Sequence, residues 1–194
     1  MPAVEITPDR VTVAAADRPG LIAAVAGCLT LHRLDVISAD TATVTTDSGQ
    51  VAVVACRVQA RDSSGPDRQR LASDLHRALS GELKVDEALA ARVRSTSRLR
   101  GGPGREAAPP RVVWAMEAAT DATILELRAA DDVGLLYRVS HALELAGANV
   151  RAARISTLGS DVVDAFYLLG DWSSAAARST VERAVITAAA PSLT

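Results

Sequence analysis

AADRPGL at residues 15–21 and AADDVGL at residues 129–135 are two copies of one sequence pattern. The offset between them is 114 residues, and it holds without a gap over the 33 residues from Val11 to Thr43, with 11 identical pairs. Self-similarity of this kind indicates a repeated supersecondary unit. We therefore expect the function to reside where two such units meet.

Each copy predicts a strand, an acidic loop with a glycine, and an amphipathic helix. In the first copy, residues 11–16 are a short apolar run typical of a strand, and Pro19 and Gly20 open the helix. Pro is tolerated in a first helical turn, and Asp17 lies near the positive end of the helix dipole. The predicted apolar helix face contains Leu21, Ile22, Val25, Cys28 and Leu29 in the first copy, and Leu135, Leu136, Val139, Ala142 and Leu143 in the second. Each loop should therefore present free backbone N–H groups at a helix start.

Two further strands and a second helix follow in each copy. The strands at residues 36–45 and 51–58 are joined across Asp47, Ser48 and Gly49, and those at 150–157 and 162–169 across Gly159. The second helix has Leu71, Leu75, Ala78 and Leu79 on one face in the first copy, and Val181, Ala184, Val185 and Ala188 in the second. Each copy is thus predicted as β-α-β-β-α.

A ferredoxin-like domain needs a fourth strand, which this order lacks. Short strand-like runs precede each copy, at Val4–Ile6 and at Val112–Glu117. Either each unit is a circularly permuted form that uses its own upstream strand, or the two units exchange edge strands. The predicted class is α+β, with two ferredoxin-like domains that contain antiparallel sheets.

Composition supports two small domains and limits the partners. Residues 94–110 are rich in Gly, Pro, Ser and Arg, so we expect them to be a linker between domains at residues 1–93 and 111–194. A net charge of −2 gives no electrostatic reason to expect nucleic acid. No long apolar run indicates a membrane span, and two cysteines outside CxxC spacing favour a cytoplasmic location.

Both copies resemble ACT domains, the βαββαβ regulatory modules that bind amino acids. DRPGL at residues 17–21 matches the usual strand-to-helix signature of that family, and DDVGLL at residues 131–136 is a looser form. The order and spacing of the pair, with LHRLDVISA at residues 31–39 and ARISTLGSDVVDAFY at residues 153–167, resemble the C-terminal tandem of the bifunctional enzymes that uridylylate and deuridylylate the PII nitrogen-signalling protein. This resemblance covers nearly the whole chain.

The resemblance implies glutamine, or another small amino acid, as the ligand, and the PII protein as a partner of the parent enzyme. It also implies that the parent carries a nucleotidyltransferase domain and an HD hydrolase domain. No His-Asp dipeptide occurs in this sequence, because His32, His76 and His141 are followed by Arg, Arg and Ala. We therefore expect a regulatory chain with no catalytic residues, metal site or cofactor of its own.

A free amino acid carries an α-carboxylate, which suits the N–H groups at a helix start, and an α-ammonium, which suits a carboxylate or amide oxygen. Gly20 and Gly134 leave room for close approach to each loop. The repeat register places Asp35 against Asn149 at the start of the next strand. ACT pairing puts the ligand between domains, so the resemblance implies composite sites. Because DDV in the second loop departs from DRP in the first, one occupied site per tandem, or a ligand only across a dimer, stays open as an alternative to two equivalent sites. The candidate residues are Asp17, Arg18, Pro19, Gly20, Leu21 and Asn149 for one site, and Asp131, Asp132, Val133, Gly134, Leu135 and Asp35 for the other.

Other interpretations remain open from the sequence. Pro and Gly in each loop can serve only to start a helix, and Asn149 can be a turn residue after Gly147. The alternative function is a stand-alone tandem ACT protein that binds another amino acid and regulates a separate partner, which Met1 as a natural start would favour. RNA binding needs exposed aromatic residues on central strands, where the first copy has aliphatic ones. Exposed sheet edges would allow a homodimer.

Overall fold

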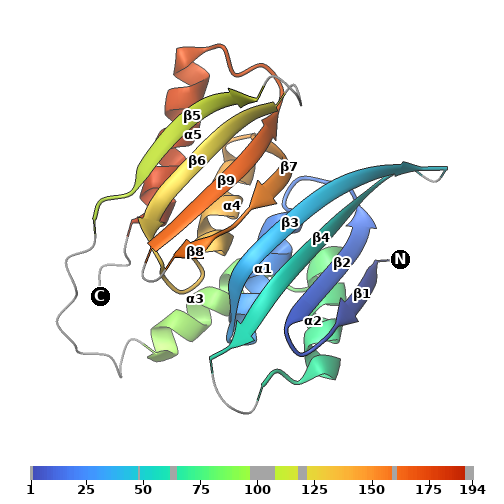
Figure 1. Cartoon of the computed structure of the whole chain (residues 1–194). Coiled ribbons are helices and arrows are strands. Elements are labelled where there is room, and N and C mark those ends of the chain that lie inside the picture. The colour runs from blue at the N-terminus through green and yellow to red at the C-terminus, as the bar shows by residue number, and fades with distance from the viewer. Residues whose placement is uncertain are drawn as a thin grey trace.

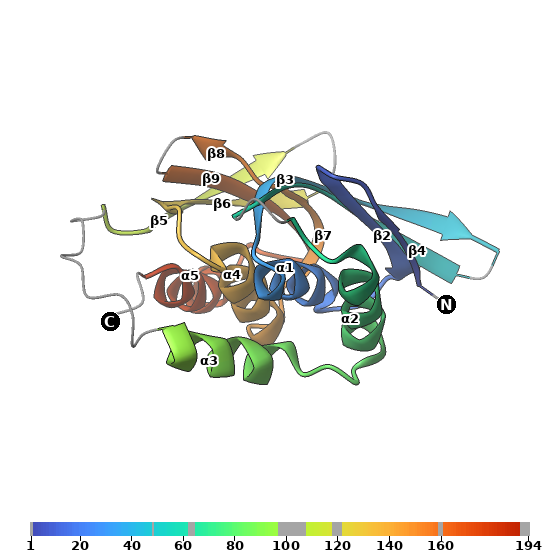
Figure 2. The same cartoon turned by 90° about the horizontal axis from the view of Figure 1, so that it is seen from below.

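Two antiparallel sheets lie side by side with their helices on one face in the computed structural model of this chain (Figures 1 and 2). The structure describes residues 2–47, 49–61, 65–96, 108–117, 122–158 and 161–190. The first unit consists of β1 (Ala3–Ile6), β2 (Arg10–Ala16), α1 (Leu21–Leu31), β3 (Leu34–Thr46), β4 (Gly49–Ala60) and α2 (Arg68–Ser80). The second consists of β5 (Arg111–Glu117), β6 (Ala122–Ala130), α4 (Leu135–Leu145), β7 (Asn149–Arg154), β8 (Thr157–Leu158), β9 (Asp161–Leu169) and α5 (Ala175–Ala189).

The strand orders confirm the predicted α+β class with two ferredoxin-like units. The first sheet runs β1-β2-β4-β3 and the second β5-β6-β9-β7, with β8 paired to β9. β1 pairs with β2, and β5 pairs with β6, so each upstream strand takes the place of the fourth strand within its own unit. Of the two arrangements that the sequence left open, the structure shows the permuted one.

The repeat seen in the sequence is reproduced in the backbone. Gly20 and Gly134 both adopt left-handed conformations, with φ of 79° and 72°, directly before α1 and α4. A shift of register follows Val36 in β3 and Val150 in β7, at equivalent positions of the two copies. Because a left-handed φ strains any residue with a Cβ, the glycine that sets each helix start is needed in both units.

The two units meet along one seam. The edge strands β3 and β7 face each other, and α1 packs against α4 behind them (Figures 1 and 2). The hydroxyl of Thr41 in β3 donates to the carbonyl of Arg151 at 3.3 Å and accepts from the N–H of Ala153 at 3.1 Å. A side chain therefore bridges the backbones of the two edges, and buried residues of both units form one continuous core.

Helix α1 is buried on more of its surface than its apolar period predicts. Ala23, Ala26 and Gly27 are buried in addition to the predicted face, of which only Ile22 is partly exposed. The reason is that α1 contacts α2, α3 (Val85–Thr96) and α4 as well as β3. Helix α3 was not predicted from the sequence. It crosses beneath the helical layer in Figure 2, where the Tyr137 hydroxyl of α4 donates to Asp86 of α3 at 3.0 Å. α3 thus follows the first unit in the chain but also holds the second.

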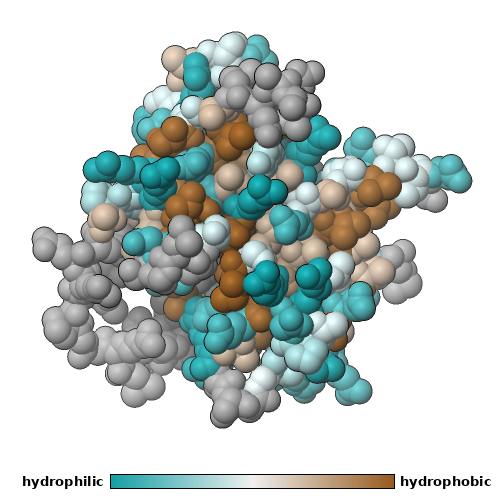
Figure 3. All heavy atoms as spheres, viewed as in Figure 1, coloured by the Kyte–Doolittle hydropathy of each residue, from teal (hydrophilic) through white to brown (hydrophobic). Residues whose placement is uncertain are grey.

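The predicted linker, residues 94–110, lies largely outside the described residues, as do the turn residues Ser48 and Gly159. On the face opposite the helices, apolar atoms gather near the seam and along β3 and β4, among polar ones (Figure 3). None of the described helices combines the length and the apolar character that crossing a membrane requires.

Gly27 of α1 lies against Val85 of α3 and Tyr137 of α4, which gives a test of this packing. A Cβ at Gly27 would collide with Cγ1 of Val85 and lie 2.8 Å from Cδ2 of Tyr137. Gly27→Ala should lower the free energy of unfolding by about 1–3 kcal/mol through overpacking, although Ala is the better helix former. Urea unfolding of Gly27→Ala, Val85→Ala and the double variant measures this, and the Gly27→Ala loss should shrink when Val85 is truncated. An equal loss in both backgrounds would contradict the packing explanation.

Candidate functional site

Two clefts lie at the seam, and each draws residues from both units. The first is formed by the loop at residues 17–21 and by the start of β7, including Asn149. The second is formed by the loop at residues 131–136, together with Asp35 from the start of β3. Their volumes are similar, about 470 and 460 Å³ including the open mouths. These are the two combinations of loop and strand start that the resemblance to ACT domains implied.

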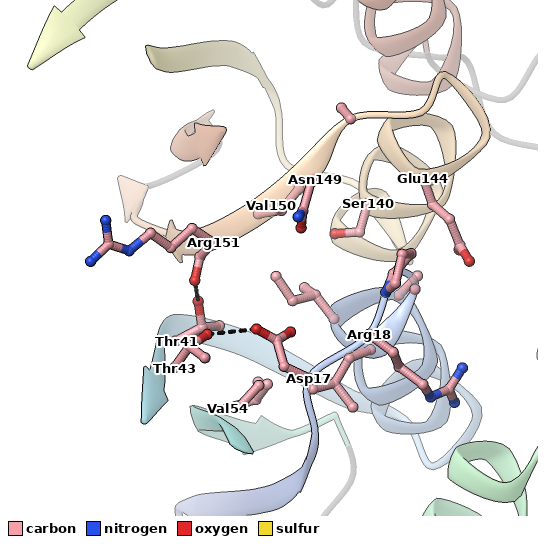
Figure 4. Close-up of a pocket in the computed structure, with 17 residues that line it drawn as sticks. Asp17, Arg18, Thr41, Thr43, Val54, Ser140, Glu144, Asn149, Val150 and Arg151 are labelled. Atoms are coloured by element: carbon pink, nitrogen blue, oxygen red, sulfur yellow. Dashed lines mark hydrogen bonds between the residues drawn. The ribbon is translucent and has the colours of Figure 1, made fainter. Parts of the chain in front are cut away.

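In the first cleft, polar groups from two units converge on a short apolar floor. Figure 4 shows Asp17 from the first loop, and Ser140 and Asn149 from the second unit, directed toward the centre. The carboxylate of Asp17 accepts from the hydroxyl of Thr43 at 2.9 Å, which fixes its direction. Val54 of β4 closes the floor. This arrangement offers a carboxylate, an amide and a hydroxyl around one small volume.

The start of α1 contributes backbone donors to this cleft. The first N–H groups of a helix have no partner within it, and no side chain among the described residues caps α1. The carboxylate of Glu144 covers Gly20 closely: a Cβ at Gly20 would lie 2.6 Å from its Cδ and 2.7 Å from its Oε2. Gly20 is therefore required for both its backbone conformation and this contact with the other unit.

Ser140 carries a buried polar atom of the first cleft. Its side chain is 5% exposed, and its hydroxyl forms no hydrogen bond among the described residues. A buried hydroxyl without a partner costs free energy that a ligand could recover by accepting from it.

The second cleft is acidic. Four carboxyl groups line it, from Asp35, Asp131, Asp132 and Asp164, together with the guanidinium of Arg61. Arg61 donates from Nε to Asp35 at 2.7 Å. Burial is the main cause that raises the pKa of Asp131, and the nearby Asp35 carboxylate adds to it.

Asp164 is the buried carboxyl group of this cleft. It is 1% exposed, and its Oδ1 has no hydrogen-bond partner among the described residues. Burial raises the pKa of Asp164 to about 7, the backbone N–H of Ser156 opposes this by a hydrogen bond, and the charge of Asp131 reinforces it. A carboxyl group with this pKa changes charge near neutral pH.

The two clefts are related by the repeat but differ in chemistry. Val54 pairs with Val13 in the first sheet, and Asp164 pairs with Leu127 in the second. Val13 and Leu127 are equivalent residues of the two copies, so Asp164 occupies the position that Val54 has in the first cleft. By the same register, Ser140 of the first cleft corresponds to Ala26 of the second. The first cleft thus has a hydroxyl over an apolar floor, and the second has a carboxyl group in the floor.

An arginine ties each loop to the end of the second helix of its unit. Arg18 donates to the carbonyl of Leu79 at the end of α2, at 3.0 Å. Arg138 donates to the carbonyl of Ala188 in α5 at 2.9 Å and to the carboxylate of Asp132 at 2.9 Å. Both loops are therefore held by their own units, while the clefts open toward the opposite unit.

Most of the predicted site residues line the two clefts, but their roles differ. Leu21 and Leu135 are buried in the core, so only their backbone can reach a ligand. The guanidinium of Arg18 points away from the first cleft in Figure 4, toward α2. Val133 is 41% exposed and is not among the residues that line the second cleft.

The sequence analysis missed Ser140, Glu144, Thr43 and Asp164 as cleft residues. Asp164 had a signal, because it occupies an inward-facing position in the alternating strand Val162–Leu168, where a polar residue is unusual. Ser140 and Glu144 lie on α4, and their direction depends on how α1 and α4 cross, which the sequence does not state. Among the described residues, no three His, Cys, Asp or Glu side chains are grouped to hold a metal ion.

Comparisons with known proteins point to one kind of enzyme, although no family model matches the chain. Three relatives are each named bifunctional uridylyltransferase/uridylyl-removing enzyme. The one from Streptomyces coelicolor is 42% identical over 88% of this chain and 21% of its own length. Those from Rhodospirillum rubrum and Mycobacterium tuberculosis are 32% and 35% identical over 86% and 84% of this chain, and over 18% and 22% of theirs. The chain therefore spans about a fifth of the length of these relatives.

Asp164 should make stability depend on pH. The pKa of Asp164 is about 7 in the folded protein, against 3.8 for an ordinary aspartate. Between pH 3.8 and pH 7, therefore, Asp164 is protonated in the folded state and ionised in the unfolded state. Its contribution to stability is therefore present below pH 4 and is lost as the pH rises through 7. When the pH rises from 5 to 8, the free energy of unfolding of the wild type should therefore fall by about 2 kcal/mol more than that of Asp164→Asn. Urea unfolding at both pH values tests this.

Asp161→Asn is the matched control, since Asp161 is exposed on the same strand. It should leave the difference between pH 5 and pH 8 as in wild type. The explanation fails if Asp164→Asn shows the same pH dependence as wild type.

Proposed function

We propose that this chain is the amino-acid-sensing regulatory region of a bifunctional uridylyltransferase/uridylyl-removing enzyme. Its similarity to such enzymes extends over about one fifth of the length of each. Two ferredoxin-like units that resemble ACT domains support this proposal. The proposed domain bounds are residues 1–93 and 111–194. The parent would transfer uridylyl groups to the PII protein and remove them, with its catalytic residues outside this chain. Two free buried thiols, Cys28 and Cys56, agree with a reducing cytoplasm.

The first cleft is the proposed glutamine site. The observation that carries the proposal is that one small volume contains the uncapped start of α1, the carboxylate of Asp17, the amide of Asn149 and the unpartnered hydroxyl of Ser140. The helix start suits an α-carboxylate, and Asp17 suits an α-ammonium. The amide and hydroxyl can exchange hydrogen bonds with the side-chain amide of glutamine.

Regulation would act through the seam. The donors of α1 belong to the first unit, whereas Ser140 and Asn149 belong to the second, so a bound amino acid bridges the two. A ligand shifts an equilibrium only by its different affinity for the two states. We infer that glutamine favours the arrangement in which the first loop and β7 stand at the spacing seen here, and that the catalytic part of the enzyme responds to this spacing.

Ser140→Ala should weaken glutamine binding about 5- to 10-fold, the value of one neutral hydrogen bond. Isothermal titration calorimetry with glutamine measures this, and glutamate and serine serve as comparison ligands. Ala26→Ser makes the matching change in the second cleft and should leave the affinity for glutamine unchanged. Gly20→Val should abolish binding, because its side chain would meet Glu144 and strain the loop.

The absence of saturable heat with glutamine would contradict the proposed site. Equal effects of Ser140→Ala and Ala26→Ser would show that glutamine does not distinguish the two clefts. Clear binding of another amino acid, lost in Gly20→Val, would keep the cleft and replace the ligand.

A further inference from the structure

Two carboxyl groups of the second cleft form no ion pair with an arginine of the described residues, although the charge of Arg61 partly offsets that of Asp131. Asp35 is paired with Arg61, and Asp132 is paired with Arg138. Among the described residues, Asp131 and Asp164 form no ion pair, although both face this cleft. Two neighbouring carboxyl groups without a cation repel each other when both are charged. The cleft is therefore electrostatically prepared for a positive group.

Asp164 also points to a ligand by its hydrogen bonding. The Asp164 side chain is 1% exposed, and its Oδ1 lacks a donor within the described part of the chain. A buried carboxylate oxygen without a donor is costly, and a cationic N–H is the strongest donor that can satisfy it. In the related first cleft, Val54 fills this position and creates no such demand.

The rest of the cleft suits the carbon chain of such a ligand. Leu34, Val36 and Ile155 contribute apolar surface beside the carboxyl groups. The methylene groups of a long basic side chain or an alkyl amine pack well on a surface of this kind while the charged end meets a carboxylate.

We propose that the second cleft binds a small organic cation, a basic amino acid or amine whose guanidinium or ammonium group donates to Asp164 and Asp131. This goes beyond the proposed function, which concerns a neutral amino acid in the first cleft. The two clefts, which are related by the repeat, would then bind different ligands at the same seam.

Arginine and citrulline make the sharpest pair of probes, because they differ by a charged guanidinium against a neutral urea. Isothermal titration calorimetry at pH 8 should show arginine binding at least about 10-fold tighter than citrulline. Lysine tests the ammonium alternative to the guanidinium. Asp164→Asn should weaken the binding of the better cation at least about 10-fold, since it removes the buried charge.

Affinity for the cation should also fall with decreasing pH. Burial raises the pKa of Asp164 to about 7, so a ligand that needs its carboxylate must displace a proton below that pH. The charged groups that line the cleft with Asp164 are Asp131, Asp132, Asp35 and Arg61. Burial is the main cause that raises the pKa of Asp164, and the charge of Asp131 adds to it. Titrations at pH 6 in buffers of different ionisation enthalpy should therefore show proton release on binding.

Ser140→Ala is the matched control in the first cleft and should leave cation binding unchanged, so failure here and failure of the glutamine site are separable. Asp164→Val, which copies the first cleft, replaces Asp164→Asn if the latter does not give a cooperative thermal transition. Equal binding of arginine and citrulline, unaltered affinity in the Asp164 variant, or no saturable heat with either cation would each overturn the proposal.

Discussion

The close contact between α1 and α4 is the constraint on which the rest of the structure depends. Gly27 allows α1 to approach Tyr137 of α4 and Val85 of α3. That approach sets the seam, which brings β3 to β7 and places the loop of each unit over the strand start of the other. Because packed interiors tolerate little change in volume, the geometry of both clefts is fixed by this one helix crossing.

Local patterns and the repeat were sufficient to predict the fold, and the resemblance to ACT domains supplied the pairing of loops with strand starts. The repeat register made Asp35 and Asn149 equivalent, and the structure has Asn149 beside the first loop and Asp35 beside the second. What the sequence did not contain was the rotation of α4 about its axis, which turns Ser140 and Glu144 toward the first cleft. Helix α3 was missed because half of its apolar residues are alanines, which give a weak pattern, and because its contacts lie in both units. Tertiary contact, rather than local propensity, determines such elements.

The gapless register ends before the strand that carries the main difference between the clefts. The hairpin between β3 and β4 is longer than its counterpart, so Asp164 and Val54 become equivalent only through their pairing with the preceding strands. Sequence comparison at the fixed offset therefore shows that the two loops are similar, but it does not align Val54 with Asp164, by which the floors of the two clefts differ. Similar entry geometry with different buried chemistry is a general way for a duplicated fold to acquire separate specificities.

The permuted strand order also affects how the chain can fold. In each unit the outer strand pairs with its neighbour in sequence, as β1 does with β2 across the short turn at Thr7–Asp9, where the N–H of Thr7 donates to the carbonyl of Arg10 at 2.8 Å. In the usual ferredoxin-like order, this edge position is filled by the fourth strand, which follows the last helix in the sequence. Replacing that distant pairing with a local hairpin lowers the mean sequence separation of contacts, which favours rapid folding. The first sheet can thus be completed before most of the second unit has left the ribosome.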